Sequence, residues 1–166
     1  MKSAITIALV PQIKSGPWVF WENLEDSIAK AAGLGFDAVE LFTASATAVD
    51  TTLLQQLLKA YPIRVCAVGT GAGKVVQGLT LTDSDTNVRE AAIKFISEMI
   101  DFGADYNAPA IIGSMQGNIP QGTERTIALQ WLSEGISILA NKAEKKGVPL
   151  VYEPLNRYET NIFNSF

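Results

Sequence analysis

The chain has 166 residues, of which 48% are hydrophobic and 18% charged, with a formal net charge of −4 and a pI near 4.8. This composition is typical of a folded domain with a sizeable core and excludes a disordered or fibrous chain. No basic stretch is interleaved with aromatic residues, so we expect no nucleic-acid partner. No apolar run approaches the roughly 20 residues that span a bilayer, so we expect no membrane association. Because the composition does not shift along the chain, we expect residues 1–166 to form a single domain.

The sequence contains one cysteine, Cys66, and no histidine. An internal disulfide therefore cannot form, which fits a reducing compartment, and we expect a cytoplasmic protein. The absence of histidine excludes catalytic triads built on histidine and histidine-rich metal sites within this chain.

Strand-like and helix-like segments alternate along the sequence. Short apolar runs predict strands, and apolar residues spaced three or four apart predict helices. Leu54 and Leu58 share one helix face, for example, and Asp50 or Thr51 can cap that helix. In chain order, the predicted elements are strand Ala4–Val10, helix Asn23–Leu34, strand Ala38–Phe42, helix Asp50–Tyr61, strand Ile63–Val68, a helix from Asp83 or Asp85 to about Phe102, strand Ala110–Ile112, helix Thr123–Lys146 and strand Pro149–Tyr152.

The last predicted helix, Thr123–Lys146, has an apolar face and a basic end. Lysines near its C-terminus complement the helix dipole and are expected to be solvated, and Gly147 ends the helix. The residues expected to face inward are Ile127, Trp131, Leu132, Ile136 and Leu139, and the lysines are Lys142, Lys145 and Lys146.

The order of four strand–helix units and a fifth strand predicts an α/β fold with a parallel sheet and right-handed crossovers. Two folds fit this order: an open doubly wound sheet, or a (β/α)₈ TIM barrel with about five of its eight strands present. Connections after strands are long, as in Gly69–Thr82 and Gly113–Gly122, whereas connections before strands are short, as at Gly147. A barrel brings all the long loops to one mouth, and this favours an incomplete TIM barrel.

A glycine-rich segment, Gly69-Thr-Gly-Ala-Gly-Lys74, follows a predicted strand and could cradle a phosphate through backbone N–H groups. Its spacing departs from the P-loop at Val68 and Val75, and from the dinucleotide-binding fingerprint at Lys74. We therefore expect a flexible loop over Gly69–Gly78, with no helix directly after the glycines, rather than a nucleotide site.

Ionisable residues cluster where the last predicted strand ends. Glu153 follows the apolar run Val148–Tyr152, Pro154 ends the strand pattern, and Arg157 and Glu159 come next. A carboxylate at the end of a buried strand costs free energy unless it binds or reacts with something. Glu153 could be an oxygen ligand of a metal or a base that acts next to a carbonyl, or it could form a structural ion pair with Arg157.

Three other places carry candidate contacts, each with a second interpretation. Glu40 lies inside a predicted strand and either points into the barrel mouth, where it would orient a neighbour, or pairs with a basic residue. Ser114, Met115 and Gln116 follow the fourth strand and either hydrogen-bond a polyol or belong to a plain loop. Aromatic residues after the first strand could wall a sugar face, bury under the first helix, or form a subunit contact. These aromatic residues are Trp18, Phe20 and Trp21.

The segment Glu153-Pro-Leu-Asn-Arg-Tyr-Glu159 resembles the motif after the fifth strand in the xylose isomerase-like TIM-barrel superfamily. The resemblance is to ketose 3-epimerases of the tagatose/psicose (allulose) type and to sugar phosphate isomerase/epimerases. Gly35-Phe-Asp-Ala-Val-Glu-Leu-Phe42 is similar to the second-strand pattern of that superfamily, and Ile111-Ile-Gly-Ser-Met-Gln-Gly117 resembles its fourth-strand exit. The resemblance covers essentially the whole chain in order, and the fifth-strand motif is its most specific part.

The resemblance implies a metal-dependent isomerase or epimerase acting on a ketose or sugar phosphate. Glu153 would bind a divalent metal, usually manganese with magnesium or cobalt as other options, and act as one of two catalytic carboxylates. One glutamate would remove a carbon-bound proton to give a metal-stabilised enediolate, and the other would return a proton on the opposite face. Glu159 would contact substrate hydroxyls near the carbonyl. The other expected substrate-binding residues are Arg157, Gly113, Ser114 and Gln116.

The remaining metal ligands of that family, an Asp, a His and a second Glu, come from strands six to eight, and this sequence ends before them. We therefore expect an N-terminal part of a barrel that is inactive alone and does not hold a metal tightly. Zinc AP endonucleases of the same superfamily carry histidine ligands on early strands, and this chain has no histidine.

The alternative is a non-catalytic half-barrel that binds a small polar ligand or self-associates. Because an open half-barrel exposes two strand edges, we expect a homo-oligomer.

Overall fold

The computed structural model of the chain describes residues 1–13, 20–21 and 23–164. Within these ranges, five parallel strands form one sheet in the order β1-β2-β3-β4-β5. The elements are β1 Ala4–Leu9, η1 Pro11–Ile13, α1 Leu24–Gly33, β2 Ala38–Thr43, α2 Thr51–Ala60, β3 Arg64–Gly69, α3 Ala72–Gln77, α4 Thr86–Ala104, β4 Ala110–Ile112, η2 Ser114–Gln116, α5 Arg125–Lys146 and β5 Leu150–Tyr152.

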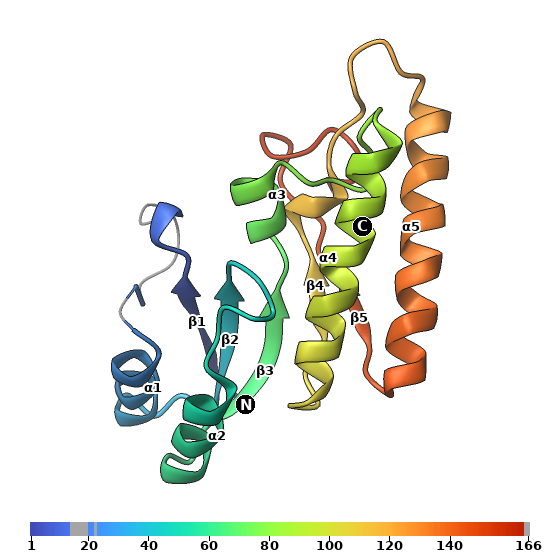
Figure 1. Cartoon of the computed structure of the whole chain (residues 1–166). Helices are drawn as coiled ribbons and strands as arrows, with labels where there is room; N and C mark the ends of the chain where they lie inside the picture. The colour runs from blue at the N-terminus through green and yellow to red at the C-terminus, as the bar shows by residue number, and fades with distance from the viewer. Residues whose placement is uncertain (14–19, 22, 165–166) are drawn as a thin grey trace.

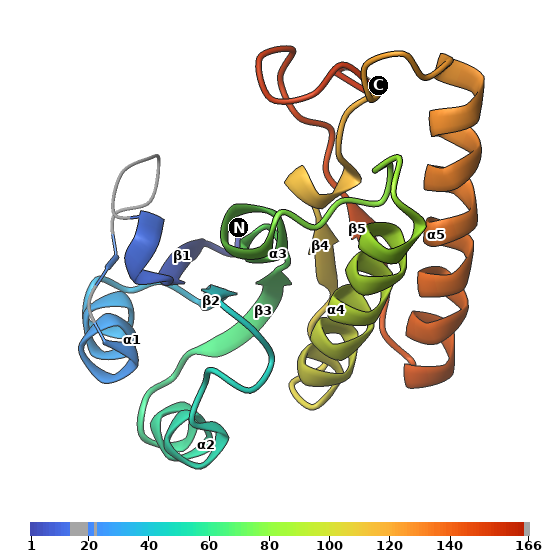
Figure 2. The ribbon, with the colours of Figure 1, turned by 45° about the horizontal axis from the view of Figure 1, so that its top comes forward.

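The order of the strands decides between the two folds expected from the sequence. A doubly wound sheet reverses its strand order at a switch point, where its ligand binds. Here each strand pairs in parallel with its neighbour in sequence, and the order never reverses. Figure 2 shows the strands as an arc with α1, α2, α4 and α5 on its outer side. The predicted TIM-barrel-like α/β fold is therefore confirmed, and the doubly wound alternative is wrong.

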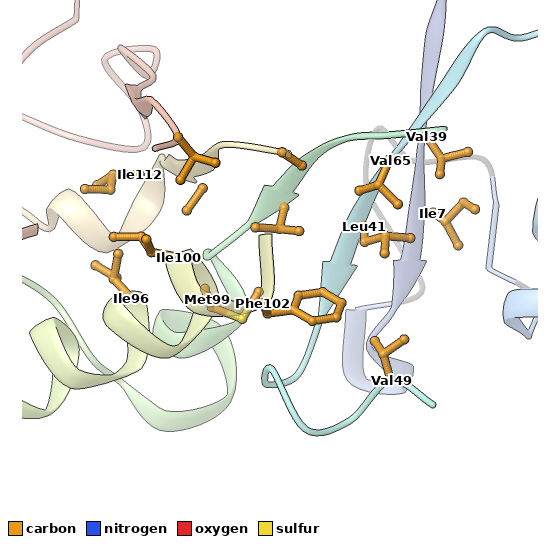
Figure 3. Packing of buried hydrophobic residues seen from close by; sticks show 14 of the residues in the cluster. Ile7, Val39, Leu41, Val49, Val65, Ile96, Met99, Ile100, Phe102 and Ile112 are labelled. Atoms are coloured by element: carbon orange, nitrogen blue, oxygen red, sulfur yellow. The ribbon is translucent and has the colours of Figure 1, made fainter. Parts of the chain in front are cut away.

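The hydrophobic core lies between the outer face of the sheet and the helices (Figure 3). Val39 and Leu41 alternate along β2 and are fully buried there, together with Ile7 of β1. Ile96 and Met99 of α4 reach the same core and are also fully buried. Each such side chain contributes about 1.5–3 kcal/mol relative to its exposed state. None of the helices in the described ranges is long and apolar enough to cross a membrane.

Two helices begin at acidic capping residues; the sequence offered Asp50 as a cap and Asp85 as one of two possible helix starts. The carboxylate of Asp50 accepts a hydrogen bond from the backbone N–H of Leu53 at 2.9 Å, at the start of α2. Asp85 caps α4 by accepting from the N–H of Asn87 at 2.8 Å, so Asp83 is not the capping residue. Each cap satisfies an N–H group that has no partner inside the helix, and contributes about 1 kcal/mol.

The loop predicted over Gly69–Gly78 is wrong, because Ala72–Gln77 forms the short helix α3. Small residues allow this helix to pack closely. A Cβ atom on Gly73 would lie 2.7 Å from the sulfur of Met115 in η2, so a larger residue would push the two segments apart. Gly78 then ends α3 in the left-handed conformation, with φ of 71°. The glycines that suggested a loop therefore serve packing and helix termination.

Helix α5 packs beside α4 (Figure 1), and one expectation for it is wrong. Ile127 is 41% exposed rather than inward-facing, whereas Leu139 is fully buried as expected. At the basic end of α5, Lys145 and Lys146 are exposed as expected, and Lys142 and Lys146 also contact the Asp101 carboxylate of α4 at 2.8 and 2.7 Å. Hydrogen bonds from Lys142 and then Lys146 hold the pKa of Asp101 below its ordinary value. The basic end of α5 thus joins the two helices.

We predict that Gly103→Ala lowers the free energy of unfolding by about 1–3 kcal/mol, although alanine favours a helix over glycine by about 1 kcal/mol. A Cβ atom at Gly103, inside α4, would lie 2.5 Å from the carbonyl oxygen of Ala108, so the backbone would have to move. Urea denaturation measures the change. The matched control is Gly33→Ala at the end of α1, where no atom lies within 4 Å of an added Cβ and stability should stay equal or rise. Equal behaviour of the two variants would contradict the close contact between α4 and Ala108.

Candidate active site

The C-terminal ends of the strands meet at one end of the sheet, where a cavity of about 460 Å³ opens. This volume lies within the range of small-molecule sites, about 300–1,000 Å³. Figure 1 shows α3 and the segment after β5 at the same end of the molecule. Carboxylates and small polar groups lie on the wall beside apolar side chains such as Ile111 and Leu155. Its lining side chains include Thr6, Glu40, Phe42, Ser114, Glu153 and Glu159.

Glu153 directly follows β5, and its backbone N–H donates to the carbonyl of Ile112 at 3.0 Å. Its side chain is exposed yet lines the cavity. A Cβ atom on Gly113 would lie 2.7 Å from Oε2 of Glu153, so the carboxylate rests over this glycine and needs the space. Within the described residues no ion pair joins Glu153 to Arg157, whose guanidinium instead donates to the hydroxyl of Tyr158 at 3.0 Å. The ion-pair interpretation of Glu153 is therefore wrong.

The segment that carries Glu159 is fastened to the loop after η2. Thr160 is buried, and its hydroxyl donates to the carbonyl of Gly117 at 2.8 Å. The side-chain oxygen of Asn118 accepts the N–H of Asn161 at 2.9 Å, and the side-chain oxygen of Asn161 accepts the N–H of Ile119 at 2.8 Å. The carboxylate of Glu159 lines the cavity and accepts a hydrogen bond from the amide of Asn156. These contacts bring Glu159 to the same wall as Glu153.

Gln116 occupies a supporting position rather than the cavity wall. Its side chain is fully buried, and its amide nitrogen donates to the carbonyls of Gly113 at 3.1 Å and Glu153 at 3.2 Å. Its amide oxygen accepts the hydroxyl of Tyr152 at 2.5 Å, and burial raises the pKa of this tyrosine to about 12. Gln116 therefore ties the ends of β4 and β5 together beneath Glu153. The sequence did not single out Tyr152, because its role depends on this buried partner.

Glu40 points into the cavity, the first of the two orientations that the sequence left open. The hydroxyl of Thr6 on β1 donates to Oε2 of Glu40 at 2.8 Å. Burial is the main cause that raises the pKa of Glu40; the Thr6 hydrogen bond lowers it, and the charge of Glu153 raises it further. Among the described residues no basic side chain pairs with Glu40. Glu40 and Glu153 therefore lie close enough to influence each other across one cavity.

Only some of the other residues expected to contact the substrate line the cavity. Ser114 and Gly113 line the cavity, whereas Arg157 does not. Phe20 is buried in the core and Trp21 is half-buried, and neither lines the cavity. Trp18 lies outside the described residues. The aromatic wall is thus not seen in the part of the chain that the structure describes, and the polar wall comes from the ends of β2, β4 and β5.

We predict that Gly113→Ala and Glu153→Ala are coupled in stability. Alanine at position 113 meets the Glu153 carboxylate, so Gly113→Ala should destabilise the wild-type background more than the Glu153→Ala background, by about 0.5 kcal/mol or more. Urea denaturation of the wild type, both single variants and the double variant gives this difference. Effects that simply add would mean that the carboxylate does not rest over Gly113.

Solved structures of two epimerases and one AP endonuclease share this fold at low identity. A 3-keto-D-glucoside 4-epimerase from E. coli matches 99% of this chain with a TM-score of 0.76 and 15% identity. D-Psicose 3-epimerase with D-tagatose from Clostridium cellulolyticum H10 matches 99% with a TM-score of 0.72 and 22% identity. An AP endonuclease, family 2, from Brucella melitensis matches 99% with a TM-score of 0.71 and 15% identity. Identities this low show the fold alone.

The chain spans less than two thirds of each of these structures, covering 60%, 56% and 59% of their respective lengths. A search of curated proteins found no match. A family model described as "Xylose isomerase-like TIM barrel" matches residues 28–166, which is most of the chain. Together with the sequential parallel sheet, this match shows that the chain belongs to the xylose isomerase-like TIM-barrel family.

Proposed function

We propose that the complete natural polypeptide carrying this sequence is a sugar epimerase or isomerase, with Glu153 as the base that removes a proton next to a ketose carbonyl. The observation that carries this proposal is the position of Glu153, whose carboxylate rests over Gly113 in the cavity at the strand ends. Family membership and the epimerases among the similar structures support the same reaction class.

Removal of a proton next to a carbonyl requires a carboxylate that is fixed in place yet reachable by the ligand. Glu153 meets both conditions, since Gln116 holds its backbone while its side chain remains open to the cavity. The proton leaves carbon for the carboxylate oxygen, and the electron pair delocalises onto the carbonyl to give an enediolate. Inversion of the carbon then needs a second acid on the opposite face of the sugar. By resemblance, that acid is a second glutamate from a later strand.

The charges on the cavity wall favour a hydroxyl-rich ligand. Glu40, Glu153 and Glu159 line the cavity, and no lysine or arginine does so in the described part of the chain. Carboxylates accept hydrogen bonds from sugar hydroxyls, whereas they repel phosphate groups. This wall therefore suits the neutral part of a ketose, and it does not complement a nucleic-acid backbone.

The residues of this chain fit the divalent metal implied by the resemblance only in part. Glu153 can supply one oxygen ligand of the kind that manganese or magnesium prefers. No group of three or more Asp, Glu, Cys or His side chains that could hold a metal ion gathers among residues 1–13, 20–21 and 23–164. A bound metal would need further ligands. The proton transfer proposed here takes place at the Glu153 carboxylate itself.

We predict that Glu153→Gln in the complete natural polypeptide lowers the rate of substrate proton exchange by about 10²-fold or more while the protein stays folded. The amide keeps the shape of the side chain but cannot accept the proton. Exchange of the carbon-bound hydrogen of a ketose for solvent deuterium, followed by NMR, measures the effect. Glu98→Gln on the exposed face of α4 is the control and should exchange at the wild-type rate. Undiminished exchange in Glu153→Gln would refute the role of this residue as the base.

Self-association is the second candidate property, and the edge of β5 favours it. Within the described residues β5 pairs only with β4, and Val151 on this strand is 37% exposed. Unpaired strand edges with exposed apolar residues invite pairing with another chain.

We predict that the chain is a dimer by light scattering and that Val151→Lys is a monomer. Ile138→Lys on α5, which changes a more exposed apolar residue (52%) away from the edge, should remain dimeric. A monomeric wild type would exclude this mode of association.

A further inference from the structure

Glu40 is a carboxylate of the cavity that takes no part in the proton transfer proposed for Glu153. It lies in β2 between Val39 and Leu41, both of which are fully buried in the core on the outer face of the sheet. Because side chains alternate along a strand, Glu40 faces the opposite side, and there it lines the cavity. An acidic residue in an otherwise apolar strand calls for a reason that packing does not provide.

The hydrogen bonds of Glu40 leave one carboxylate oxygen available. Oε2 accepts the hydroxyl of Thr6, whereas in the described part of the chain no hydrogen bond or ion pair reaches Oε1. A glutamine could accept the same bond from Thr6 without a buried charge. A carboxylate oxygen that is partly withdrawn from water without a hydrogen-bond donor is unfavourable, so Oε1 is open to a donor from a ligand in the cavity.

The neighbouring strand leaves open space in front of this oxygen. A Cβ atom on Gly69, at the end of β3, would lie 2.9 Å from Oε1 of Glu40 and 2.8 Å from Cδ2 of Phe42. Gly69 is not among the glycines with positive φ, so its backbone conformation does not require glycine. A glycine at such a strand position marks close approach by another group. Any other residue at this position would crowd Oε1.

We propose that Glu40 is a second substrate-binding carboxylate, whose Oε1 accepts a hydrogen bond from a ketose hydroxyl remote from the carbon at which Glu153 acts. This inference rests on the proposed sugar epimerase or isomerase function. Glu40 comes from β2 and Glu153 follows β5, so the two carboxylates approach one ligand from separate parts of the cavity wall. Glu40 therefore selects a sugar by the hydroxyl that it binds, while Glu153 performs the chemistry.

A set of monodeoxy ketoses tests this assignment in the complete natural polypeptide. A site that hydrogen-bonds a hydroxyl discriminates against the analogue that lacks it. For the parent ketose, we predict that Glu40→Gln weakens binding about tenfold or more, the usual loss for a hydrogen bond to a charged group. For one deoxy analogue, the wild type and Glu40→Gln should bind equally. Titration calorimetry gives the dissociation constants, and deuterium exchange gives the KM and kcat for each sugar.

Two further variants separate binding from folding. Thr6→Val removes the hydrogen bond to Oε2 but keeps the Glu40 carboxylate, so it should still discriminate against the same analogue. Glu98→Gln should match the wild type for every sugar. Thermal unfolding of each variant confirms that it is folded at the temperature of the titration.

The outcomes distinguish this inference from the function on which it rests. Equal weakening of every analogue by Glu40→Gln, or no weakening at all, would overturn the role of Glu40 even where Glu153→Gln abolishes exchange. Normal exchange in Glu153→Gln would instead reject the proposed base. Failure of the folded wild type to bind any ketose in the set would reject the proposed function and the role of Glu40 together.

Discussion

The sequential parallel order of the strands is the constraint on which the site depends. Since β1 to β5 run in the same direction and each pairs with its neighbour in sequence, all their C-terminal ends lie at one edge. Residues that are far apart in the chain, such as Glu40 and Glu153, therefore share one cavity. The fold therefore brings the two carboxylates to one cavity, and individual contacts then fix their positions.

Two neighbouring glycines and a hydrogen bond from Gln116 then help to fix the positions of the carboxylates. Gly69 leaves room beside Glu40, and Gly113 leaves room beside Glu153. In both cases the missing side chain matters because a Cβ atom would collide with a carboxylate oxygen. Gln116 adds support from below by binding the backbone of Glu153. A polar wall can thus form at the end of a sheet whose other face is packed with apolar side chains.

The sequence predicted the strands, most helix boundaries and the caps, because these follow from local periodicity and from side chains that bond to nearby N–H groups. It also indicated Glu153, since a carboxylate after an apolar strand is conspicuous. It could not reveal α3, whose glycines serve contacts with the distant Met115. Nor could it place Gln116 in the interior or choose the orientation of Glu40, because both depend on partners from other strands.

A crystal structure of the complete natural polypeptide with a bound ketose would test the central claim most directly, namely that one sugar contacts two carboxylates from separate strands of this sheet. The account predicts electron density for the sugar in the cavity, with a reacting carbon beside Glu153 and a hydroxyl within hydrogen-bond distance of Glu40. A sugar bound away from the strand ends, or a Glu153 side chain turned out of the cavity, would contradict it.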